Sequence, residues 1–182
     1  MKHIITCFLS AFMCLELNAA TDFFGMTKMS FDGESYNLSW SANSHSNVYI
    51  EDFLPKGEAM NHFEKKVSVT LVKGADCETI FRKKLDDIAV AFAEKQIDKY
   101  DVDTTDMNDV VIHVLSRLEQ GETMYVVQSC VYRVVKNNDD VVLFEAIQRS
   151  YKDFQPFLKK EDSLAEKMKK SIRLLNKNIL VK

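Results

Sequence analysis

The sequence predicts an α+β fold: a mainly antiparallel sheet of about six strands, flanked by two long helices. Three observations support this prediction. Several short stretches alternate apolar and polar residues, two longer stretches repeat apolar residues at helical spacing, and polar turns separate three consecutive strands in the middle of the chain. The expected order of elements is ββ-α-β-α-βββ-α.

The middle of the chain carries the clearest strand pattern. Its three β-branched and aromatic runs are Val110–Leu118, Thr123–Val135 and Val141–Tyr151. The residues between these runs are polar and rich in turn formers, which favours tight hairpins. We therefore expect an antiparallel meander of three strands here.

The first half of the chain predicts a hairpin followed by a third strand. Ser35–Ser41 and Val48–Leu54 alternate in the way that hairpin strands do, and Lys66–Val72 alternates again. Between them, Glu58–Lys65 is expected to form a short helix after the break at Pro55.

Two long helices are expected. Asp76 is a suitable N-cap for a helix over Cys77–Tyr100, and the acidic stretch Asp101–Asp109 is expected to be a solvated link into the meander. The closing helix should cover Lys160–Leu180, because its apolar residues recur every three or four positions. These residues are Leu164, Met168, Ile172, Leu175 and Ile179.

Residues 1–20 have the pattern of a secretory signal peptide. A basic start precedes the apolar run Ile4–Leu15, and two alanines, Ala19 and Ala20, end the segment. The apolar run is shorter than the roughly 20 residues that span a bilayer. We therefore expect residues 21–182 to be a single exported domain without a transmembrane segment, located in the periplasm or secreted.

Composition limits the partners. The chain has 24 Lys and Arg against 27 Asp and Glu, a net charge of −3. This weakly acidic balance disfavours general nucleic-acid binding, which needs a basic surface. A hydrophobic content of 46% is sufficient for an ordinary core.

Cys77 and Cys130 are the cysteines outside the predicted signal peptide. Cysteines of exported proteins often pair, so this pair is a candidate disulfide, and such a bridge would contribute roughly 4 kcal/mol to stability. The alternative is two buried thiols.

The sequence contains no recognisable catalytic, cofactor or metal motif. Phosphate-binding loops and paired zinc-ligand spacings are both missing, and the spacing links none of His45, His62 and His113 to Cys77 as a base. Polar residues do interrupt two strands of the meander, where they either line a groove on one sheet face or form its solvent face. They are Gln128, Arg133, Glu145 and Arg149.

One stretch resembles small exported bacterial proteins of unknown function. Phe53-Leu54-Pro55-Lys56-Gly57-Glu58 is similar to the turn that ends a strand in these proteins, and Val67-Ser68-Val69 is similar to the strand that follows. Their usual tryptophan is replaced by Phe63 here. The order of elements also resembles the Mog1/PsbP-like fold of the periplasmic DcrB-type proteins. The resemblance implies an accessory or binding module with no catalytic residues to carry over.

Taken together, the sequence favours an exported, non-enzymatic accessory or binding domain that contacts a protein partner in the cell envelope. Two alternatives stay open. One is a small-ligand binder or enzyme that uses a groove on the sheet face. The other is a secreted effector or toxin-neutralising protein, which differs from the first hypothesis in its partner.

Overall fold

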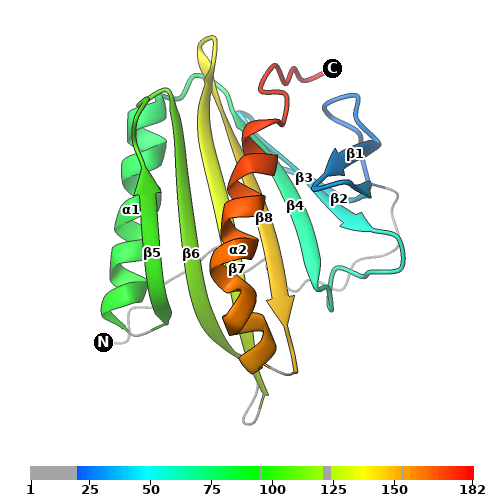
Figure 1. Cartoon of the computed structure of the whole chain (residues 1–182). Helices are drawn as coiled ribbons and strands as arrows, with labels where there is room; N and C mark the ends of the chain where they lie inside the picture. The colour runs from blue at the N-terminus through cyan, green and yellow to red at the C-terminus, as the bar shows by residue number, and fades with distance from the viewer. Residues whose placement is uncertain (1–19, 95, 121–123, 153) are drawn as a thin grey trace, which may run out of the picture.

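The computed structural model describes residues 20–94, 96–120, 124–152 and 154–182, and within them the chain forms one eight-stranded sheet with a helix on each face (Figure 1). The sheet curls into a half-barrel. The strands are β1 (Lys28–Phe31), β2 (Glu34–His45), β3 (Val48–Pro55), β4 (Lys65–Val72), β5 (Ile97–Asp103), β6 (Asp109–Gln120), β7 (Met124–Asn137) and β8 (Asp140–Ser150). The helices are α1 (Cys77–Ala93) and α2 (Phe154–Arg173).

The strand order in the sheet is β1-β2-β3-β4-β8-β7-β6-β5, and every neighbouring pair is antiparallel. The sheet therefore consists of two meanders, β1–β4 and β5–β8. They meet where β4 pairs with β8, from Lys65 opposite Gln148 to Val72 opposite Val141. Helix α1 connects them by carrying the chain from β4 to β5 at the far edge.

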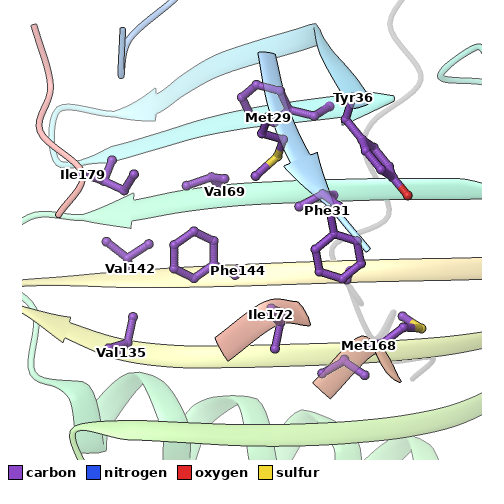
Figure 2. Packing of buried hydrophobic residues seen from close by; sticks show 14 of the residues in the cluster. Met29, Phe31, Tyr36, Val69, Val135, Val142, Phe144, Met168, Ile172 and Ile179 are labelled. Atoms are coloured by element: carbon purple, nitrogen blue, oxygen red, sulfur yellow. The ribbon is translucent and has the colours of Figure 1, made fainter. Parts of the chain in front are cut away.

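One face of the sheet packs against α2, and we call it the α2 face. Figure 2 shows Met29 and Phe31 of β1 gathered with Phe144 of β8 and with Met168 and Ile172 of α2. Met168 and Ile172 are 0% exposed. Because β1 and α2 belong to the same apolar cluster, the curled sheet encloses α2 on this side.

The opposite face, the α1 face, has its own apolar cluster. Phe81 and Ile88 of α1 pack there with Ile112 of β6 and Val134 of β7. Helix α1 contacts β5, β7 and β8. Successive side chains of a strand point to opposite faces of the sheet, so β6, β7 and β8 each contribute residues to both apolar clusters.

A buried glutamate fixes the start of the described chain. Glu51 accepts backbone hydrogen bonds from Phe23 (2.6 Å) and Phe24 (3.1 Å) through Oε1, and the backbone N–H of Lys182 donates to Phe23 O at 2.9 Å. The other oxygen, Glu51 Oε2, has no hydrogen-bond partner among the described residues. Burial raises the pKa of the Glu51 carboxyl above its ordinary value.

The prediction of about six strands flanked by two long helices is wrong, although the α+β class holds. The sheet has two additional strands. β1 lies in a stretch without a clear period, and β5 occupies residues expected to end the first helix and start an acidic link. β5 forms because pairing with β6 overrides the local helical pattern.

The helices also differ from their predicted bounds. The short helix expected over Glu58–Lys65 is a series of turns with one isolated bridge, Ala59 to His62. Helix α2 begins at Phe154 and ends at Arg173, where Arg133 of β7 donates to the carbonyls of Ile172 and Leu175. Neither described helix has a stretch both long and apolar enough to cross a membrane.

Candidate functional site

A row of polar side chains crosses the α1 face. The pairing registers place Asp52 of β3 opposite Ser68 of β4, Ser68 opposite Glu145 of β8, and Glu145 opposite Tyr132 of β7. Directly opposite residues of neighbouring antiparallel strands share one face of a sheet. We call these four residues the polar row.

Two lysines supply positive charge to the polar row. Lys66 Nζ donates to Asp52 Oδ2 at 3.2 Å, and Ser68 Oγ donates to Asp52 Oδ1 at 2.5 Å. Lys84 of α1 lies with its ammonium 3.8 Å from the centre of the Tyr132 ring. The row is therefore a mixed-charge strip held between the sheet and the flank of α1.

The two carboxylates of the polar row respond differently to this setting. Burial raises the pKa of Asp52, and the nearby Lys66 charge and Ser68 hydroxyl offset that effect only in part. Burial also acts to raise the pKa of Glu145, but the charges of Lys66 and Lys84 and the neighbouring Tyr132 and Cys130 donors outweigh it. The pKa of Glu145 is consequently lowered, which favours its ionised form.

The structure brings together three of the four polar residues that the sequence singled out. Arg149 Nε donates to Gln128 Oε1 at 2.8 Å, Gln128 contacts Cys130 Sγ at 3.8 Å, and Cys130 contacts Glu145 at 3.6 Å. The Arg149 guanidinium also lies 4.0 Å from the Phe63 ring centre. Gln128 and Arg149 thus extend the polar row from Glu145 toward one end of the strands.

Arg133 does not belong to this group, because it lies on the α2 face. Its guanidinium forms two hydrogen bonds of 2.7 Å with the carboxylate of Asp109 and is 5% exposed. Gln128 and Arg133 are five positions apart on one strand, and an odd separation places side chains on opposite faces. The grouping of all four residues in one groove was therefore geometrically wrong.

Half-buried apolar residues surround the polar row on the part of the α1 face formed by β2, β3, β4 and β8. Trp40 lies opposite Asp52, Ile50 opposite Thr70, and Thr70 opposite Leu143. Trp40, Ile50, Val72 and Leu143 all keep intermediate exposure. On the reverse side of the same strands, Phe53, Val67, Val69 and Leu71 are 0% exposed. We call this partly uncovered region, with Trp40, Ile50, Val72 and Leu143, the open face.

A second polar cluster joins α2 to the sheet, and its central residues are buried. His113 Nε2 lies 2.7 Å from Glu161 Oε1 and 3.1 Å from Ser129 Oγ, and His113 Nδ1 lies 3.0 Å from Asp101 Oδ2. His113, Ser129 and Glu161 are at most 2% exposed. Lys99 also pairs with Glu161. The cluster links α2 to β5, β6 and β7, and its buried centre at His113, Ser129 and Glu161 lies beneath α2, with Lys99 and Asp101 at its exposed margin.

Cys77 and Cys130 are both free and buried. Cys77 Sγ contacts the carbonyl of Val134 at 3.9 Å, and Cys130 lies four residues from Val134 along β7, about 13 Å in an extended strand. Bridged cysteines need Cα atoms within about 7 Å, so this structure does not form the candidate disulfide. Burial raises the pKa of both thiols, which disfavours the reactive thiolate.

Two surface hollows lie away from the polar row. One, of about 370 Å³, lies between the β1–β2 turn and the end of α2. The other, of about 250 Å³, lies at the start of α1 and is lined in part by Asp76 and Cys77. In the described part of the chain, no three His, Cys, Asp or Glu side chains gather as metal ligands would.

Sequence reasoning missed Asp52, Lys66, Ser68 and Lys84 as members of the site. Asp52 was the detectable one, since it and Glu51 are adjacent charged residues within the mainly apolar strand β3. Its neighbours depend on the pairing of β3, β4 and β8, and the β4–β8 pair joins segments about 75 residues apart. No local pattern reports such a pairing.

Comparison with known proteins assigns a family without an activity. No curated protein and no solved structure matches the chain, and the Mog1/PsbP-like resemblance is not confirmed. A protein-family model does match residues 26–178, a range that spans the described helices and strands from β1 to α2. The chain belongs to this uncharacterised bacterial protein family.

Proposed function

We propose that this protein is an exported, non-enzymatic binding domain and that a protein partner in the cell envelope docks on the open face. One observation carries the proposal. Trp40, Ile50 and Val72 stay partly exposed on this face, whereas Phe53, Val67, Val69 and Leu71 on the reverse face of β3 and β4 are 0% exposed. A solvent-facing antiparallel sheet face is usually polar, so an apolar one calls for a cover.

The composition of the open face suits a protein partner. Tryptophan is enriched in protein interfaces, where its large ring excludes water. The charged end of the polar row, at Asp52 and Lys66, lies beside Trp40 and can fix the orientation of a docked segment. The partner surface that fits is an apolar helix or strand with polar groups at one margin.

The enzyme alternative has less support. The histidine with the best-placed neighbours, His113, is 1% exposed beneath α2, and Ser129 beside it is 0% exposed. The raised pKa of Cys77 argues against a thiolate nucleophile at the start of α1. Nucleophilic catalysis needs both an activated group and access for the substrate.

Export of the protein is part of the proposal and rests on the pattern of residues 1–20, of which all but Ala20 lie outside the described residues. N-terminal sequencing of the protein from the envelope or culture fraction tests it. A mature chain starting at Ala20 or Thr21 would support export. An intact Met1 in the cytoplasmic fraction would contradict it.

Site-specific photo-crosslinking in the source cells tests the docking surface. A photoreactive phenylalanine analogue replaces Trp40 in one variant and Val90 in the control, because Val90 is 44% exposed on the outer side of α1. We expect one specific adduct from position 40, and we expect Ile50→Lys to abolish it while Val90→Lys leaves it intact. Equal adducts from positions 40 and 90, or none from position 40, would refute docking on the open face.

A further inference from the structure

The edge of the sheet at β5 has the features of a contact between two copies of this chain. In the described part of the structure, β5 pairs with β6 and with no second strand. Figure 1 shows β5 at the outer margin of the sheet, beside α1. An edge strand exposes unpaired backbone groups that another strand can bind.

Exposed aromatic residues lie next to this edge. Phe92 of α1 is 47% exposed and Tyr100 of β5 is 38% exposed, and their rings meet edge to face at 5.5 Å. Both lie on the α1 face, at its β5 margin. A partner strand beside β5 would cover these rings, which the chain itself leaves in water.

The charges of β5 do not protect the edge, because each is neutralised within the chain. Asp98 pairs with Arg117 at 2.8 Å, Asp101 with Lys169 at 2.7 Å, and Asp103 with Arg173. β5 also lacks proline, and its one irregularity lies between Ile97 and Lys99, at its first residues. The usual means of blocking an edge strand are therefore largely missing from Tyr100 onward.

The sequence of β5 is complementary to itself. If two antiparallel copies pair about a two-fold axis at Tyr100, Tyr100 faces Tyr100 and Lys99 faces Asp101 of the other copy, twice. Asp98 then faces Val102. In this register no like charges lie directly opposite each other, and an aromatic pair across strands favours it. A two-fold contact needs this self-complementarity, since the same residues serve both subunits.

We propose that two copies of this protein associate through β5, in antiparallel register about Tyr100, to form one continuous sheet. This contact lies at the opposite end of the sheet from β2 and β3, so the open face stays available for its own partner. The dimer is independent of the proposed function and stands or fails on separate measurements.

Analytical ultracentrifugation of the protein purified from the source cells tests the association. We expect a concentration-dependent dimer, and Tyr100→Lys should raise its dissociation constant about tenfold or more by placing two like charges on the axis. The matched control is Val90→Lys, another exposed apolar position turned away from the edge. A monomer at every concentration, or equal dimers from both variants, would overturn the proposal.

A cysteine variant tests the register. Tyr100→Cys places two thiols opposite each other across the axis, where Cβ atoms of directly opposed residues are about 4.5–5.5 Å apart. Diamide, which accepts two electrons, should then convert Tyr100→Cys to a covalent dimer much faster than Val90→Cys. Equal rates for the two variants would show random collision and refute the register, and circular dichroism verifies that both variants are folded.

Discussion

Replacing Arg133 provides a quantitative test of how α2 is held. Arg133 forms two 2.7 Å hydrogen bonds with Asp109 and donates to the carbonyls of Ile172 (3.1 Å) and Leu175 (2.9 Å). It is 5% exposed. Arg133→Ala therefore removes four hydrogen bonds and leaves the Asp109 carboxylate and two carbonyls at the end of α2 without this donor.

Breaking a buried ion pair by removing one partner costs about 3–5 kcal/mol. The Asp109 side chain keeps 27% exposure, so water recovers part of that loss, while the two carbonyls add to it. We expect Arg133→Ala to lower the free energy of unfolding by about 4 kcal/mol, or the melting temperature by about 8–16 °C for a chain of this size. Arg133→Met should lower the free energy of unfolding nearly as much. Methionine restores the apolar contacts of the arginine stem, but it supplies none of the lost hydrogen-bond donors.

Arg117 is the matched control, since it also pairs with an aspartate across strands. Its Nε lies 2.8 Å from Asp98, but its side chain is 58% exposed. Arg117→Ala should cost about 0–1 kcal/mol. Urea unfolding followed by circular dichroism measures both variants. Losses within about 1 kcal/mol of each other would refute the argument that burial and the α2 carbonyls make Arg133 important.

Burial underlies three other predictions. Because burial raises the folded-state pKa of Glu51, the folded state binds this proton more tightly, and the free energy of unfolding falls as pH rises above the ordinary value of about 4.3. Glu51→Gln should reduce this fall, which urea unfolding at several pH values measures. An unchanged dependence of the unfolding free energy on pH would contradict the prediction. Cys77 and Cys130 should react with Ellman's reagent only in denaturant, and rapid labelling of the native protein would show that their burial is wrong. Met168→Ala should cost about 2–5 kcal/mol, and Leu174→Ala, at an 85% exposed position just after α2, should cost under about 0.5 kcal/mol. Equal costs in thermal unfolding would contradict the burial of Met168 in α2.

Local pattern was sufficient for strands with a clear run of β-branched and aromatic residues between polar turns. The three strands of the central meander are all present, at close to their predicted bounds. Pattern failed for β5, where three aspartates and a lysine leave little apolar alternation to indicate a strand. The first helix was predicted to continue to Tyr100. Tyr100 lies in β5 instead, because hydrogen bonds to β6 stabilise a strand that local propensity does not indicate.

The apolar stripe predicted for the closing helix is buried or half-buried, but only part of it is helical: the rest lies in an irregular segment after α2. Met168 and Ile172 are buried by α2, as the spacing predicted. Ile179 is buried as well, at 7% exposure, but it lies in an irregular tail beyond Arg173. The stripe therefore predicted which residues are buried. The end of the helix instead coincides with the hydrogen bonds that Arg133 donates to the carbonyls of Ile172 and Leu175.

The candidate site was predictable only within single strands. Glu145 and Arg149 are four positions apart, so alternation alone places them on one face. Assembly of the polar row with Asp52 requires the β4–β8 pairing, which no local signal encodes. The odd spacing between Gln128 and Arg133 along β7 is enough, by alternation alone, to put these two side chains on opposite faces.

The seam between β4 and β8 also has a kinetic consequence. Each meander is built from pairings of consecutive strands, which close short loops, whereas Lys65 must find Gln148 across a long stretch of intervening chain. Long-range closure is the slow part of folding. We therefore expect the two meanders to form early and their docking along β4 and β8 to set the folding rate. Fragments divided near α1 would then associate along this seam, with α2 packing on β1 as a second contact.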